Sequence, residues 1–112
     1  MNMTKNIIEH SLEEAFNELK GFLADPATVP AIGRCVDILA ESLEAGGKVM
    51  SCGNGGPLCD APHFAEALTG RFRGSRRPLP ATSINDPAYF TCVGTDFPFG
   101  EMFQNWDEAF GQ

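Results

Sequence analysis

The first 24 residues repeat apolar and charged side chains with the period of an α-helix. Apolar residues recur at three- and four-residue intervals between Lys5 and Ala24, and mostly acidic residues fill the positions between them. The apolar set is Ile8, Leu12, Ala15, Phe16, Leu19 and Leu23, and the acidic set is Glu9, Glu13, Glu14 and Glu18. The pattern predicts an amphipathic helix over residues 5–24.

A second helix is predicted directly after Asp25-Pro26. Thr28 is expected as its N-cap and Pro30 in its first turn, and Gly46-Gly47 is expected to end it. Its apolar face consists of Ile32, Val36, Leu39 and Leu43. Because the connection between the two helices is short, we expect a helical hairpin over residues 1–47.

The remaining chain changes to short apolar runs separated by glycine and proline. "KVMSC" (48–52) is predicted as a buried strand, and "LPATSI" (79–84) as a second strand, which the turn residues 85–87 end. Residues 61–69 favour a helix, and "RFRGSRRP" (71–78) a loop. Helical spacing of Met102, Phe103, Trp106 and Phe110 predicts a last helix, while "AYFTCV" (88–93) is left unassigned. The order predicts an α/β fold with two parallel strands.

The turn "GNGG" at residues 53–56 is the first candidate for a ligand-binding site. Three glycines allow backbone N–H groups to approach an anion, but the same glycines also suit a tight turn between core elements. The turn lacks the Lys of a P-loop, and Leu58 breaks the dinucleotide-binding fingerprint.

His63 is the candidate chemical residue of the helix that follows. A carboxylate three or four residues further along would share its face, and these positions hold Glu66 and Ala67. An ordinary surface or core histidine is the alternative. A solvated Glu66 is likewise the alternative to a carboxylate that works together with His63.

Pro62 changes the expected start of this helix. In a helix over residues 57–69, Pro62 would be interior and would cost about 3 kcal/mol. We therefore expect the helix to begin later, with Asp60 as N-cap and Pro62 in the first turn. The glycine turn and the helix dipole would then lie apart, and Asp60 would disfavour a bound phosphate.

Composition limits the classes of function. The 112 residues contain 15 acidic and 8 basic side chains, a formal net charge of −7, which argues against nucleic-acid or membrane-surface binding. Four of the basic residues gather at Arg71, Arg73, Arg76 and Arg77, either as a solvated loop or as a contact for a phosphate or an acidic neighbouring chain. The four cysteines lack a CxxC pair and are expected to be reduced thiols of a cytoplasmic protein.

Several stretches in order resemble the N-terminal half of the bacterial phosphoheptose (sedoheptulose 7-phosphate) isomerases of the sugar-isomerase (SIS) domain superfamily. They are "GGKVMSCGNGG", "CDAPHFAEALTGRFR" and "RPLPATSINDPAYFTCVGTDFPF". The resemblance implies a Rossmann-like SIS domain, of which residues 48–112 form the first, truncated part after the oligomerising hairpin 1–47. It also implies a cytoplasmic homotetramer that carries zinc and isomerises sedoheptulose 7-phosphate to D-glycero-D-manno-heptose 7-phosphate, toward the lipopolysaccharide core.

The resemblance also implies roles for single residues. Asn54, Gly55 and Gly56 match the substrate-binding turn, Asp96 matches an acidic substrate contact, and His63 matches a metal ligand. Three positions depart from the family pattern. Pro57 replaces a serine, Thr95 replaces an asparagine, and Ala67 replaces the glutamate that serves as base and metal ligand.

These departures predict impaired isomerisation by this chain, because no catalytic residue is identified in it and the family's Ser/Thr-rich phosphate loop and C-terminal Gln and His lie beyond the matched half. Zinc binding is in doubt for the same reason. Two alternatives are a non-catalytic SIS-type assembly protein, resembling the DnaA initiator-associating proteins, and a decayed fragment without function.

Overall fold

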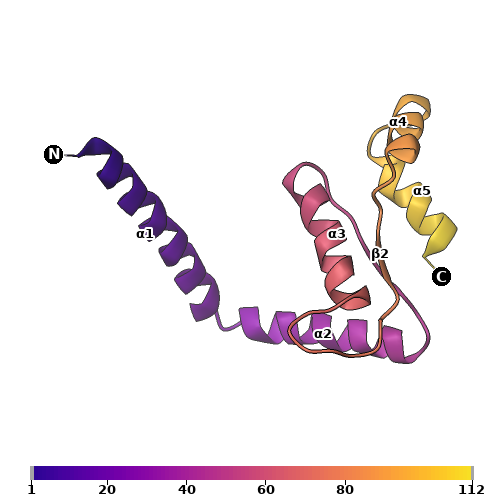
Figure 1. The fold of residues 1–112 in the computed structure, drawn as a ribbon, viewed down its shortest axis with the longest axis horizontal. Coiled ribbons are helices and arrows are strands. Elements are labelled where there is room, and N and C mark those ends of the chain that lie inside the picture. Colours follow the sequence, from indigo (N-terminus) through magenta and orange to yellow (C-terminus); the bar gives the residue numbers. More distant parts are fainter. Residues whose placement is uncertain (1, 112) are drawn as a thin grey trace. The chain divides into compact units, whose positions relative to one another are not determined.

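The computed structural model describes residues 2–111, which form two compact units, one up to Ile38 and one from Leu39 onward. Five helices and two strands follow one another in these residues. Figure 1 shows their course along the chain. No helix in this range is both long and apolar enough to cross a membrane.

The first helix, α1 (Met3–Ala24), confirms the prediction from the apolar repeat. Asn2 caps it, since its side-chain oxygen accepts a hydrogen bond from the Lys5 amide at 3.2 Å. None of its residues is buried, and Leu12 and Phe16 are 66% and 64% exposed. The apolar stripe of α1 is therefore exposed among the described residues.

The second helix, α2 (Thr28–Glu44), begins one residue earlier than expected. The Ala31 amide bonds to the Ala27 carbonyl at 3.0 Å, so Thr28 lies inside the first turn and the predicted Thr28 N-cap is wrong. The Asp25 side chain accepts from the Ala27 amide at 2.9 Å and shapes this start.

The predicted end of α2 at the double glycine is confirmed. Gly46 has a φ of +84°, and the Gly47 amide donates to the Ser42 carbonyl at 2.7 Å, as in a Schellman cap. The two helices and their short connection are thus present, but α1 and α2 do not pack on each other in the described chain.

Both predicted strands form, and they pair in parallel. β1 (Val49–Ser51) and β2 (Ala81–Ser83) align Met50 with Thr82. One helix, α3 (Gly56–Thr69), packs on both strands and lies beside β2 in Figure 1. Small residues of this helix face the sheet closely, and the buried core of the chain consists of Val49, Ala61, Ala65, Ile84 and Met102.

The expected late start of α3 is wrong. The helix begins at Gly56 with Gly55 as N-cap, Asp60 is not a cap, and Pro62 lies inside the helix. Pro57 falls in the first turn, where a missing N–H group leaves no bond unmade, so it favours this early start. The interior Pro62 is tolerated because packing of Ala61 and Ala65 on the sheet holds the helix through it.

The segment left unassigned from sequence is helical. α4 (Pro87–Asp96) starts with Asp86 as N-cap, whose carboxylate accepts from the Tyr89 amide at 2.9 Å. α5 (Glu101–Phe110) confirms the last predicted helix. α4 and α5 pack through aromatic rings, with Tyr89 and Trp106 in edge-to-face contact at 4.8 Å, and the Tyr89 hydroxyl donates to the Met102 carbonyl at 2.6 Å.

Candidate functional site

The glycine turn lies between the carboxyl end of β1 and the first residue of α3. Gly55 has φ +66° and ψ −123°, a conformation that side chains other than hydrogen disfavour. A Cβ at Gly53 would overlap the Pro57 ring, so glycine is required there as well. The turn is therefore held in one shape by its own sequence, with Asn54 and Gly56 exposed.

Backbone donors of this turn are available to a ligand. Among residues 2–111, the N–H groups of Asn54, Gly55 and Gly56 have no hydrogen-bond partner, while the Leu58 amide bonds to the Gly55 carbonyl at 3.1 Å. Because α3 begins at Gly56, these donors also lie at the positive end of the helix dipole. The structure therefore brings together the turn and the helix dipole, which Pro62 was expected to separate.

His63 lies on the exposed face of α3, in an open hollow of about 250 Å³. The hollow is lined by Asp60, His63, Phe64, Ala67 and Phe72. The helical residues among them follow the spacing i, i+3, i+4 and i+7, which places them on one face of the helix. Asp60 is thus a carboxylate on the same hollow as His63, one helical turn earlier.

Glu66 does not line this hollow. Its carboxylate lies next to Gly70, where an added Cβ would come within 2.8 Å of the Glu66 Oε1 atom. Position 67 does line the hollow, but its methyl group offers neither a base nor a ligand. Glu66 thus has a carboxylate but does not line the hollow, whereas Ala67 lines the hollow but has no functional group.

A zinc ion, which the family resemblance implies, does not fit the residues of this chain. Zinc sites take three or four protein ligands from His, Cys, Asp or Glu. Residues 2–111 contain no group of three or more such side chains placed to hold a metal ion. His63 and Asp60 offer two donors at most, fewer than a zinc site requires.

Asp96 and His63 lie on different helices, α4 and α3. Asp96 ends α4, is exposed, and accepts a hydrogen bond from the Cys92 thiol at 3.7 Å. Among the described elements, α4 contacts α5 and neither α3 nor β1. Packing among the described helices and strands therefore does not bring Asp96 to the face of α3 that carries His63.

The four arginines lie in the loop that links α3 to β2. The Arg76 guanidinium donates to the Ala67 and Leu68 carbonyls at 2.7 and 2.6 Å and so caps the end of α3. The Arg73 guanidinium lies 5.1 Å from the centre of the Phe72 ring. Arg76 thus has a structural role, whereas Arg71 and Arg77 are exposed.

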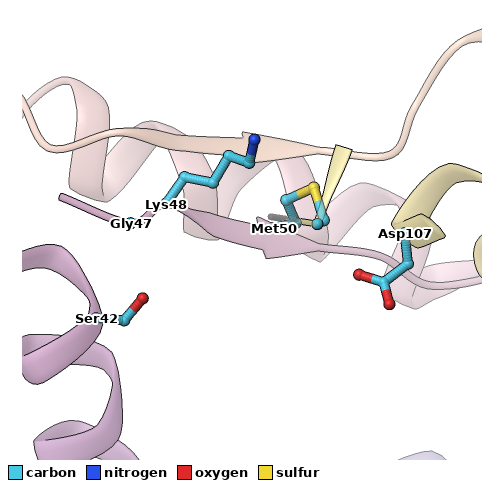
Figure 2. Close-up of a pocket in the computed structure, with 6 residues that line it drawn as sticks. Ser42, Gly47, Lys48, Met50 and Asp107 are labelled. Atoms are coloured by element: carbon cyan, nitrogen blue, oxygen red, sulfur yellow. The ribbon is translucent and has the colours of Figure 1, made fainter. Parts of the chain in front are cut away.

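A further hollow of about 270 Å³ lies at the opposite, amino end of β1 (Figure 2). It is lined by Ser42, Gly47, Lys48, Met50, Asp107 and Gly111. In Figure 2 the Lys48 amine and the Asp107 carboxylate point apart, and they form no ion pair within the described residues. Without convergent polar groups this hollow is no candidate site.

Sequence reasoning missed the place of Asp60, because the expected late helix start assigned it to the cap. The signal was available in the spacing of Asp60, His63, Phe64 and Ala67, which predicts a shared face once the helix extends back to Gly56. Phe72 was not predicted at this site, since it comes from the loop and its position depends on tertiary contacts.

The chain is similar in sequence to known proteins over most of its length. The SIS domain family matches residues 13–104. Phosphoheptose isomerases of Escherichia coli O139:H28 and Shigella boydii serotype 18 are each 49% identical to the chain over 110 residues, which is 98% of the chain and 57% of the relative. The chain thus spans little more than half the length of these curated relatives.

Solved structures of phosphoheptose isomerases are similar to the chain in fold. A phosphoheptose isomerase from Francisella tularensis matches with a TM-score of 0.88 at 31% identity, over 99% of this chain and 58% of that chain. A second one, from Neisseria gonorrhoeae, matches with a TM-score of 0.75 at 27% identity, over 99% and 56% of the two chains. With a family match over most of its length, the chain belongs to the SIS domain family.

Proposed function

We propose that the chain carries the sugar-phosphate-binding turn of an SIS-type isomerase and has impaired isomerase activity by itself. The substrate class follows from the phosphoheptose isomerases to which it is similar. The corresponding reaction converts sedoheptulose 7-phosphate to D-glycero-D-manno-heptose 7-phosphate, for the heptose of the lipopolysaccharide core. The free thiols of its four cysteines suit the reducing cytoplasm as the place of action.

The start of α3 at Gly56 is the observation that carries this proposal. Unpaired N–H groups of Asn54, Gly55 and Gly56 meet the positive end of the helix at an exposed turn. Such an arrangement stabilises the negative charge of a bound phosphate or the hydroxyl groups of a sugar. Pro57 removes one further donor, so we expect binding to be weaker than with a complete set of amides.

The proposed impairment follows from the face of α3 that carries His63. An aldose–ketose isomerisation needs a base within hydrogen-bond reach of the C1 and C2 protons. Position 67 provides only a methyl group on the hollow, and Glu66 faces Gly70. A single chain therefore has a turn that can bind the substrate, but it lacks a carboxylate base at position 67, where the family resemblance places one.

We further propose that the chain forms homo-oligomers through its N-terminal helices. No residue of α1 is buried, although the helix carries a long apolar stripe. An exposed stripe of this length on one helix is typical of an association surface.

The test of the activity proposal is turnover of sedoheptulose 7-phosphate by the purified 112-residue chain. We expect product formation near the uncatalysed background, both with and without added zinc. A His63→Ala variant serves as control for a contaminating isomerase. Clear turnover by the chain that His63→Ala abolishes would contradict the proposed impairment.

The second candidate function is that of a non-catalytic SIS-type assembly protein, like the DnaA initiator-associating proteins. Ala67 in the hollow, together with the exposed stripe of α1, favours this alternative. Stoichiometric binding of a replication initiator by the full chain, in the absence of sugar-phosphate binding, would support it over the isomerase.

A further inference from the structure

The edge of β1 that faces away from β2 is free in the described part of the chain. The Val49 amide donates to the Pro80 carbonyl at 2.9 Å, and the Ser51 carbonyl accepts from the Ile84 amide at 2.9 Å. Val49 and Ser51 thus direct their backbone groups toward β2, and Met50 between them directs its N–H and C=O groups to the other edge. The described sheet has two strands, so the backbone groups of Met50 have no strand partner in it.

Two hollows adjoin this free edge. The hollow of about 270 Å³ in Figure 2 lies on the side of Lys48, and another of about 380 Å³ lies on the side of Cys52. Met50 and Asp107 line both hollows. Among the described elements β1 packs on β2 and α3, and no helix packs against its free edge. An unpaired strand edge beside open space is a place where a further strand can add to a sheet.

The side chains along β1 divide between the two faces of the sheet. Ser51 faces α3, since its hydroxyl donates to a carbonyl of that helix at 2.6 Å, and Val49 is buried. Because successive side chains of a strand alternate, Lys48, Met50 and Cys52 share the opposite face. This is the face that the two hollows adjoin.

A positive and a negative group lie on either side of Met50. Lys48 precedes it by two residues, and Asp107 of α5 shares a hollow with Cys52 at the carboxyl end of the strand. In Figure 2 Met50 lies between Lys48 and Asp107. Both charged side chains are exposed, and neither forms an ion pair among residues 2–111. The edge is thus basic at one end and acidic at the other, which makes it complementary to its own reverse.

We propose that β1 of a second copy of this chain adds to this edge in antiparallel orientation, with Met50 opposite Met50. In that register the two Met50 residues exchange both of their backbone hydrogen bonds, and Lys48 of each copy lies opposite Cys52 of the other. Each Lys48 amine then meets the Asp107 carboxylate of the other copy, once on each side of the two-fold axis. A parallel arrangement would instead place like charges together.

This interface is separate from the N-terminal helix α1 and from the glycine turn. It uses β1 and α5, which both belong to the unit from Leu39 onward. An extended segment of a different protein could use the same backbone groups. A second copy of this chain is favoured as the occupant because it supplies both complementary charges, Lys48 and Asp107, at the matching ends of the strand.

Hydrogen exchange of the full chain tests the strand pairing. The Met50 amide, and the Cys52 amide on the same edge, are expected to exchange about tenfold more slowly at millimolar than at micromolar concentration, because pairing engages their N–H groups. Met50→Pro removes the donor on the free edge and spares the bonds to β2, so it is expected to abolish the concentration dependence at Cys52. Met50→Leu is the control that retains it. Exchange at Met50 and Cys52 that does not change with concentration would overturn the proposal.

Charge exchange tests the antiparallel register by sedimentation equilibrium. The chain carries Leu12→Ser and Phe16→Ser, which remove apolar contacts through the exposed stripe of α1. Lys48→Glu or Asp107→Lys alone is expected to raise the dissociation constant about tenfold, since each brings like charges together on both sides of the two-fold axis. Lys48→Glu with Asp107→Lys is expected to return it to within about threefold of the original, because opposite charges again face each other.

A matched control separates this pairing from net charge. Glu108 is the exposed neighbour of Asp107 on α5 and lines neither hollow. Lys48→Glu with Glu108→Lys restores the net charge but is expected to leave association weak. Recovery as complete as with Asp107→Lys would overturn the proposal, and so would a chain with the α1 substitutions that stays monomeric at all concentrations. None of these measurements involves a sugar phosphate, so their outcome is independent of the proposed function.

Discussion

The Ser51 hydroxyl donates a hydrogen bond of 2.6 Å to the Ala61 carbonyl, which precedes the interior Pro62 of α3. The bond joins the last residue of β1 to the middle of the helix that carries His63. It is partly buried, so water does not readily replace it. The strand and the helix on either side of the glycine turn are therefore fixed to each other beyond the turn itself.

Loss of this bond is expected to destabilise the fold from Leu39 onward. Ser51→Ala leaves the Ala61 carbonyl without its hydroxyl partner and should lower the free energy of unfolding by about 1 kcal/mol. Urea unfolding followed by the fluorescence of Trp106, the single tryptophan, measures this change. Ser11→Ala is the control, because the Ser11 hydroxyl bonds to the Ile7 carbonyl at an exposed place on α1. An equal effect of both substitutions would contradict the account.

The two prolines of α3 are expected to differ in their effect on stability. Pro62→Ala restores an interior N–H donor for the Leu58 carbonyl and should raise the free energy of unfolding by about 1–2 kcal/mol. Pro57→Ala acts in the first turn and should leave it unchanged or lower it by up to about 1 kcal/mol. Urea unfolding of both variants tests the early helix start. A gain in stability from Pro57→Ala that matches that from Pro62→Ala would argue against it.

Arg76 is expected to stabilise the end of α3. Arg76→Ala removes the donors to the Ala67 and Leu68 carbonyls and should cost about 1 kcal/mol of the free energy of unfolding, since the site is exposed. The Leu79 amide, which bonds to the same Leu68 carbonyl at 3.1 Å, should then exchange its hydrogen faster. Arg77→Ala is the matched control with an expected change below about 0.5 kcal/mol. An unchanged hydrogen-exchange rate of the Leu79 amide in Arg76→Ala would contradict the proposed capping role of Arg76.

A carboxylate at position 67 is expected to improve metal binding. Ala67→Glu adds a ligand to the hollow that holds His63 and Asp60. It should lower the dissociation constant for zinc about tenfold, because even residues that only support a metal ligand change the affinity by about this factor. Competition with a fluorescent chelator measures the dissociation constant. Glu66→Ala is expected to leave zinc binding unchanged, because Glu66 faces Gly70. A larger loss from Glu66→Ala than gain from Ala67→Glu would reverse these assignments.

The fold was predictable wherever local periodicity decides structure. The repeat of α1, the glycines after α2 and the two short strands were all identified from the sequence, because each depends on neighbouring residues. The start of α3 was predicted wrongly, since tertiary packing of Ala61 and Ala65 outweighed the local penalty of Pro62. α4 was missed because Asn85-Asp86-Pro87 was interpreted as a turn, although Asp86 and Pro87 also form a good helix start.

The candidate site was predictable in part for the same reason. The turn 53–56 and His63 are local signals, and the structure places both at α3. The position of Asp60 in the hollow depends on where α3 begins, and that of Phe72 depends on the path of the loop after α3. Neither is determined by a few neighbouring residues. Asp96 was assigned by resemblance alone, and it lies on α4, which among the described helices and strands contacts only α5.

We propose that the turn at the start of α3 binds a sugar phosphate although position 67 lacks a carboxylate base. A titration of ¹⁵N-labelled chain with sedoheptulose 7-phosphate, followed by amide chemical shifts, tests it most directly. We expect saturable shifts at Asn54, Gly55, Gly56 and Leu58, without conversion of the sugar during the experiment. Absence of shifts at these amides at millimolar sugar phosphate, or shifts centred on another part of the chain, would contradict it.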